Sequence, residues 1–169
     1  MKQQGIFILG FLLILSTNIF AETNLGKVAY CNVTKVFDEY AKTKDNDAVL
    51  AKKHDEYQKQ RTSKIDKIRE AQGKLSILKE DEKNKLQAQI DKDAADLNEF
   101  DRQQQTDMRK ERNDKITVIL EDIEKAINEI SAKETYSMVF NDKVLLYTDK
   151  AFDITDQVVK VLNEKYPPK

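Results

Sequence analysis

Residues 65–97 read IDKIREAQGKLSILKEDEKNKLQAQIDKDAADL, and this stretch decides the fold. Its apolar residues recur at mostly helical spacings on both sides of a charged run at 79–83. If the chain reverses at this run, residues whose numbers sum to about 160 face each other across two antiparallel helices. That register opposes four apolar or aromatic pairs: Leu75 with Leu86, Ile68 with Ile90, Ile65 with Leu97, and Tyr57 with Phe100.

The helical pattern extends well beyond this stretch. From 41 to 133 the chain is rich in Lys, Glu, Gln, Asp, Ala and Leu, which helices favour or tolerate. Between residues 27 and 166 there is no proline, and Gly73 is the one glycine. A chain that turns every dozen residues needs many more of both. We therefore expect a coiled-coil-like helical arm at 41–135. At about 1.5 Å per residue, roughly 40 residues each way give an arm of about 60 Å.

The two ends of the chain predict a small body with β structure. Aromatic residues gather at 27–40 and 136–166, whereas the arm holds only Tyr57 and Phe100. Residues rich in β-formers predict three strands, and a polar turn at 141–143 predicts a hairpin between the last two. The expected strands are 27–33, 136–140 and 144–147. The fold class is thus mainly α, with a long antiparallel helical hairpin projecting from a three-strand β segment.

A short helix is expected to close the chain. Asp153 is a suitable N-cap, and the apolar residues that follow it fall on one helical face. That face comprises Ile154, Val158, Val161 and Leu162.

Residues 1–21 are typical of a secretory signal peptide. Lys2 provides the positive start, residues 6–15 are almost wholly apolar, and Ala21 is a small residue at the expected cleavage point. This predicts a soluble exported product with one domain at 22–169. Cys31 is the only cysteine and cannot form an intramolecular disulfide, so we expect a small buried apolar group there.

The charge pattern and the residue inventory exclude several function classes. Charged residues make up 35% of the chain and the formal net charge is -1, which argues against nucleic-acid binding. His54 is the only histidine and lies among charged helix residues. The run at 45–47 lacks the glycine and distal glutamate of a calcium loop. No nucleophile, base and orienting group come together, so we expect no enzyme, metal site or cofactor.

Both ends together resemble the Skp/OmpH family of periplasmic chaperones. The resemblance lies in KVAYCNVTKVF at 27–37, YSMVF at 136–140, VLLY at 144–147 and DITDQVV at 153–159. It implies a trimer with a β-barrel-like core and three α-hairpin arms, which hold unfolded outer-membrane proteins without ATP. Well-known members are strongly basic, whereas this chain has a pI of about 6.0. Contact with lipopolysaccharide or a membrane surface is therefore left open.

Two sets of residues follow from this interpretation. Apolar arm residues either only pack the two helices of the hairpin together or also contact unfolded client proteins. Weak multivalent contact of this kind suits the binding of many different partners. The candidate client-binding residues are Tyr57, Ile65, Ile68, Leu75, Leu86, Ile90, Leu97, Phe100 and Met108. A body of about 45 residues without a disulfide is near the lower limit for an independent core, which favours association. The candidate oligomer core is Val28, Tyr30, Val33, Phe37, Val139, Leu146 and Tyr147.

The function expected from these features is an ATP-independent periplasmic holdase for unfolded outer-membrane proteins. The alternative is a structural coiled-coil spacer or assembly protein of the cell envelope. That alternative predicts the same helices but no binding of unfolded chains.

Overall fold

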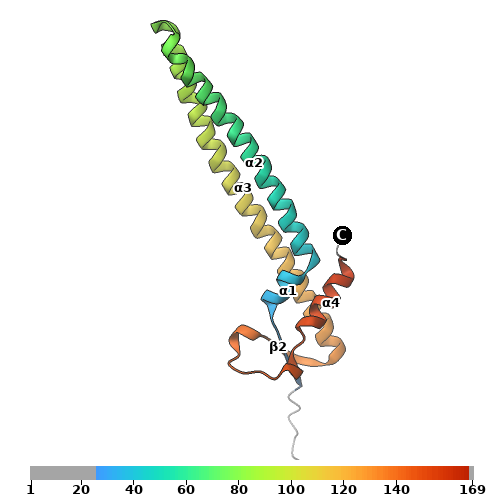
Figure 1. Cartoon of the computed structure of the whole chain (residues 1–169). Helices are drawn as coiled ribbons and strands as arrows, with labels where there is room; N and C mark the ends of the chain where they lie inside the picture. The colour runs from blue at the N-terminus through green and yellow to red at the C-terminus, as the bar shows by residue number, and fades with distance from the viewer. Residues whose placement is uncertain (1–25, 168–169) are drawn as a thin grey trace, which may run out of the picture.

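A long two-helix hairpin stands on a small body in the computed structural model, which describes residues 26–167 (Figure 1). Helix α2, Ala41–Lys74, runs away from the body, and α3, Glu80–Glu134, returns to it. At about 1.5 Å per residue, α2 spans about 50 Å. The predicted class, mainly helical with a small β part, is confirmed. The predicted signal peptide at 1–21 lies outside the described residues.

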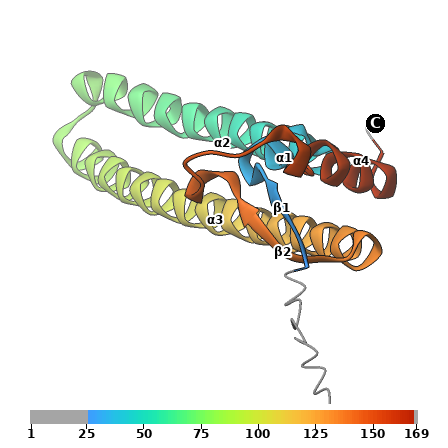
Figure 2. The ribbon, with the colours of Figure 1, turned by 90° about the horizontal axis from the view of Figure 1, so that it is seen from below.

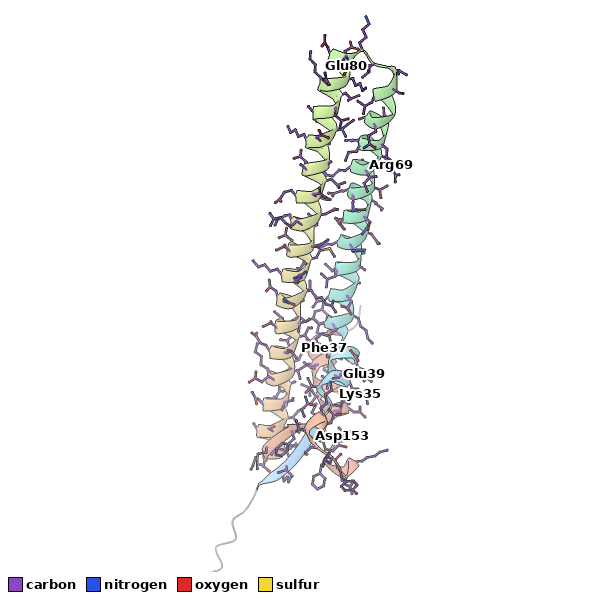
Figure 3. All side chains as sticks on the ribbon, turned by 90° about the vertical axis from the view of Figure 1, so that its left-hand side faces the viewer. Lys35, Phe37, Glu39, Arg69, Glu80 and Asp153 are labelled. Carbon is purple, nitrogen blue, oxygen red and sulfur yellow. The ribbon has the colours of Figure 1, made fainter. Side chains whose placement is uncertain are left out.

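The hairpin turns slightly earlier than the sequence predicts. After α2 the chain forms a short 3₁₀ helix, Leu75–Ile77, and Leu78 and Lys79 are extended. The predicted reversal at 79–83 is therefore a few residues late. Three acidic residues, Glu80 to Glu82, occupy the first turn of α3. Negative charge there is stabilised by the helix dipole, so the charged run begins a helix and does not form the turn. Glu80 accordingly lies at the far end of the arm from Phe37 and Asp153 (Figure 3).

The body contains a two-stranded parallel sheet within residues 26–167. Strand β1, Lys27–Cys31, pairs with β2, Tyr136–Asn141, and the two lie side by side in Figure 2. Parallel strands need a long crossover, and here the whole arm provides it. α3 ends at Glu134, and the left-handed backbone of its C-cap, Thr135 (φ 61°), turns the chain into β2.

The predicted third strand at 144–147 is wrong for the described chain. The side chain of Asn141 accepts a hydrogen bond from the Lys143 N–H at 3.1 Å, and a 3₁₀ helix follows at Asp142–Val144. This local turn ends the strand, so no hairpin partner returns along β2. Instead, Tyr30 of β1 forms an isolated bridge with Asp153.

The first strand is also shorter than the predicted range of 27–33. Asn32 ends it and caps α1, Val33–Glu39, by accepting a hydrogen bond from the Lys35 N–H at 2.7 Å. Asparagine is among the preferred N-cap residues because its side-chain oxygen satisfies a free N–H of the first turn.

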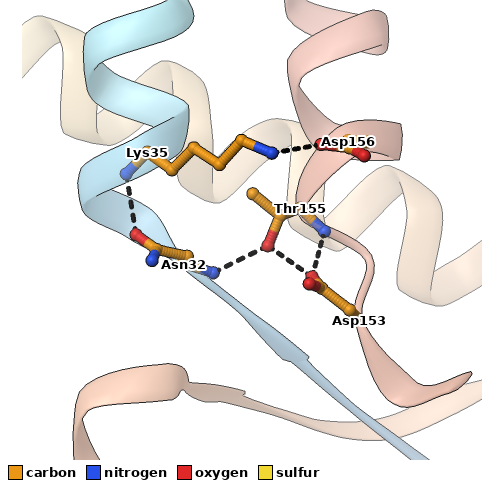
Figure 4. Close-up of polar contacts among 5 residues, drawn as sticks. All are labelled: Asn32, Lys35, Asp153, Thr155 and Asp156. Carbon is orange, nitrogen blue, oxygen red and sulfur yellow. Dashed lines mark hydrogen bonds and ion pairs between the residues drawn. The ribbon is translucent and has the colours of Figure 1, made fainter. Parts of the chain in front are cut away.

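The closing helix is α4, Thr155–Lys165, and its N-cap is Ile154, one residue after the predicted Asp153. The Asp153 carboxylate accepts a hydrogen bond from the Thr155 N–H at 2.9 Å and another from the Thr155 hydroxyl. That hydroxyl in turn accepts from the Asn32 N–H at 2.9 Å, which joins the start of α1 to the start of α4 (Figure 4). Lys35 and Asp156 add an ion pair at 2.7 Å. Both of these side chains are exposed, so the pair contributes little to stability.

The core lies where the body meets the base of α3. Its buried residues come from β1, α1, α3 and α4 and from the cap positions 40 and 154: Ala29, Cys31, Val36, Tyr40, Ile119, Ile123, Ala126, Ile130, Ile154, Val158 and Leu162. Three of the four residues predicted on the α4 face are among them, and Val161 is half-buried. Cys31 is 1% exposed, which confirms a small buried group, and burial raises the pKa of its thiol to about 11.

Candidate client-binding arm

An aromatic and polar cluster joins the two helices midway along the arm. The rings of Tyr57 and Phe100 lie 5.6 Å apart between centroids, as the predicted register requires. The Tyr57 hydroxyl donates to the Asp101 carboxylate at 2.9 Å, and Arg61 donates to the same carboxylate at 3.0 Å. Desolvation raises the pKa of Tyr57, and the bond to Asp101 raises the pKa of Arg61. The Lys64 ammonium lies 5.2 Å from the centre of the Phe100 ring.

Polar pairs continue this register toward the body. Each joins a side chain of α2 to one of α3: Lys53 with Glu111 at 2.6 Å, Asn46 with Lys115 at 3.1 Å, and Lys42 with Asp122 at 2.7 Å. At the base, the Tyr40 hydroxyl donates to Asp122 at 3.2 Å. Burial, followed by the charge of Asp122, raises the pKa of Tyr40 to about 12. The proximal seam is therefore held largely by polar contacts.

The structure separates the predicted client-binding residues into two groups. Tyr57 is 9% exposed and Ile90 is 3% exposed, so both are packed in the seam. The others keep part of their side-chain surface open to solvent: Ile65, Ile68, Leu75, Leu86, Leu97, Phe100 and Met108. These seven residues can therefore pack between the two helices and still contact a client protein. Their contact with clients stays a prediction.

The arm also exposes apolar residues that the sequence argument did not select. Ile77, in the turn at the tip, is 81% exposed. Val49, Val118 and Leu120 are exposed near the base. Helical spacing puts Ile116, Ile119 and Ile123 on one face of α3. Val118 and Leu120 do not share that spacing, so the sequence could have predicted their exposure.

The predicted oligomer-core residues also divide. Tyr30 is buried, and Val33, Phe37 and Val139 pack partly buried against the core, while Val28 is half-buried. Leu146 is fully exposed and Tyr147 is 86% exposed. Four more apolar residues of the same segment are exposed: Met138, Phe140, Val144 and Phe152. A concentration of exposed large apolar residues is typical of an interaction surface.

Neither a metal centre nor a membrane span is found in the part of the chain that the structure describes. Within residues 26–167, no three His, Cys, Asp or Glu side chains gather in a way that could hold a metal ion. Over the same range, no helix combines the length and the apolar character that crossing a membrane requires.

These features define an α-hairpin protein with a small β body, and comparison with known proteins gives its family. The family model OmpH, described as outer membrane protein (OmpH-like), matches residues 27–162. The chain therefore belongs to the OmpH-like family. Its fold resembles the crystal structure of a proposed outer membrane chaperone (OmpH-like) from Caulobacter crescentus CB15. The TM-score is 0.76 at 14% identity, covering 84% of this chain and 86% of that one. No curated protein matches the chain.

Proposed function

We propose that this protein is an ATP-independent holdase chaperone of the periplasm, which binds unfolded outer-membrane proteins and prevents their aggregation. Membership of the OmpH-like family supports a chaperone role. The observation that carries the proposal is the arm itself, where half-exposed apolar side chains are scattered among charged ones along both helices.

Such a surface suits the holding of many different unfolded chains. Each half-exposed residue, such as Ile68 or Leu97, offers only a small apolar contact. Many weak contacts, once linked, give avidity without a specific sequence match. The charged side chains between them keep the arm soluble and prevent arms from adhering to each other. Binding and release then need no nucleotide.

The holdase is proposed to be a trimer with a β-barrel-like core. Leu146 and Tyr147 are exposed in a single chain, and they would be buried against neighbouring subunits. A two-stranded sheet also leaves edges that pairing with another subunit would close. The number three rests on the family resemblance.

The proposed location is the periplasm, reached after cleavage of the signal peptide at 1–21. Mass spectrometry of the exported protein tests this proposal. A mature chain beginning at Glu22 supports it, whereas an intact Met1 or a lipid on Cys31 contradicts it.

A scattering assay separates the holdase from the structural spacer. An outer-membrane β-barrel unfolded in urea is diluted into buffer, with and without the purified protein and without nucleotide. A holdase suppresses the light scattering in proportion to its concentration. A spacer leaves the scattering unchanged, and that result would refute the proposed function.

A further inference from the structure

The root of the arm has two unlike sides. On one side, Lys42, Asn46 and Lys53 of α2 form the polar pairs with α3 described above. Their spacing of four and seven residues places them on one stripe of the helix. Val49 falls within this stripe, between Asn46 and Lys53. We refer to it as the braced side, because polar contacts cross the seam there.

The other side of the seam contains a groove, and the Asn46–Lys115 pair forms its edge toward the braced side. Two adjoining hollows, of about 430 and 250 Å³, share Asp47, Leu50 and Arg112. Together they form what we term the root groove. Its apolar lining includes Leu50, Met108 and Ile116, and Arg109 also borders it. Asp47 belongs to α2 and the two arginines belong to α3, so the groove has an acidic rim and a basic rim.

Lys115 at the edge of the root groove is paired with Asn46, but three other charged residues of the groove have no partner across it in the described chain. Within residues 26–167, no ion pair or side-chain hydrogen bond involves Asp47, Arg109 or Arg112. This differs from the braced side, where the polar α2 side chains named above contact α3. A guanidinium has five N–H donors and no acceptor, and an ionised carboxylate only accepts. One rim therefore donates hydrogen bonds and the other accepts them.

A peptide backbone in an extended form has the complementary chemistry. Every residue other than proline presents one N–H and one C=O, and in an unfolded chain these groups have no protein partner. A folded second copy has most of its backbone groups already paired. The two rims therefore fit an unfolded segment better than they fit another folded subunit. The apolar lining adds a place for one of the side chains of that segment.

We propose that the root groove binds an extended segment of an unfolded client, with an apolar side chain on Leu50, Met108 and Ile116. Arg109 and Arg112 donate to its carbonyl oxygens, and Asp47 accepts from its N–H groups. The recognition is independent of client sequence, because every peptide unit provides these groups. This inference rests on the proposed holdase function and assigns it a site.

Crosslinking from two adjacent positions tests the groove directly. Leu50→Cys and Val49→Cys are prepared in the full exported protein and labelled with benzophenone maleimide. The native Cys31 is buried and stays unlabelled. The client is the urea-diluted outer-membrane β-barrel. We expect the Leu50 probe to crosslink to the client, and the Val49 probe, on the braced side, to do so at least several-fold less.

A pair of charge variants provides an independent reading. Arg109→Gln with Arg112→Gln should weaken client affinity about ten-fold, since both rim donors are lost. Lys92→Gln with Lys110→Gln removes the same charge from exposed positions outside the groove. This control should leave affinity within about two-fold, because neither lysine lines the groove.

Each other outcome overturns the inference. Equal crosslinking from both probes, or equal weakening by both charge variants, means that the groove is not a preferred site. Crosslinking of the Leu50 probe to a second copy without client means that the groove is a subunit interface. If the unaltered protein binds no client at all, the proposed function fails together with the inference.

Discussion

Replacing Ile123 by alanine should destabilise the protein far more than the same replacement at Ile77. Ile123 lies on the base of α3, is 2% exposed, and belongs to the core shared with the body. Ile77 lies in the turn at the arm tip and is 81% exposed. The two substitutions remove the same atoms, so any difference between them reports burial.

The expected loss in the free energy of unfolding follows from the burial of Ile123. Isoleucine to alanine removes three carbon atoms, worth about 2.4 kcal/mol of transfer free energy at about 0.8 kcal/mol each. The cavity that remains adds to this cost, and buried substitutions of this kind fall at about 2 to 5 kcal/mol. Ile77→Ala leaves no cavity and should change the free energy of unfolding by no more than about 0.5 kcal/mol.

Urea unfolding followed by circular dichroism measures both variants. With a slope of about 2 kcal/mol/M, Ile123→Ala should lower the midpoint by about 1 to 2.5 M. Protein concentration must be the same throughout, because association also stabilises the folded state. Equal losses in the two variants, or a larger loss at Ile77, would refute the assignment of the core to the base of α3.

Three further predictions concern the body. Tyr147→Asp should lower both the particle mass in light scattering and the melting temperature, because it places a charge in the proposed subunit interface. An unchanged particle mass would mean that Tyr147 is not part of that interface. Thr135 has a positive φ. Thr135→Gly should raise the free energy of unfolding by about 1 kcal/mol in urea titrations, because a β-branched residue is strained there; a loss of stability would contradict this. Cys31 should resist alkylation until urea unfolds the chain. Burial raises its folded pKa from 9.0 to about 11. Its stabilising contribution is therefore complete below about pH 9 and is lost as pH rises toward about 11. The urea midpoint should therefore fall between about pH 9 and pH 11, and less steeply in Cys31→Ala than in the unaltered protein. An equally steep fall in both proteins would contradict this prediction.

The sequence predicted the arm because its evidence is local and repeated. Helix formers and apolar spacings recur over about ninety residues without a proline, and few folds other than a helical hairpin accommodate that pattern. The register followed because a reversal near 79–83 opposes four apolar or aromatic pairs at once, and the contact of Tyr57 with Phe100 confirms one of them. The turn was misplaced because acidic residues suit both a solvated turn and the first turn of a helix.

The body was predicted less well because its structure depends on contacts distant in sequence. Residues 144–147 have strand-like composition, yet a strand needs a partner, and the Asn141 turn directs this segment away from β2. Ile119 and Ile123 show the same dependence on distant contacts. They lie within the predicted arm at 41–135, and only the packing of α1 and α4 shows that they belong to the core.

The candidate site was predictable in kind but not in detail. Apolar periodicity identified the seam, but it could not distinguish buried Ile90 from half-exposed Leu97. The root groove depends on which side chains of two helices line the seam and stay unpaired across it, and no linear pattern carries that information. Asp47 and Arg112 look like ordinary solvated residues in the sequence.

The mass of the client complex tests the central claim most directly. The exported protein is mixed with a urea-diluted outer-membrane β-barrel without nucleotide, and the soluble complex is measured by native mass spectrometry. We expect a particle of three copies of this chain with one unfolded client held in solution. A monomeric chain, or a trimer without client because the client has aggregated, would contradict the proposed trimeric holdase.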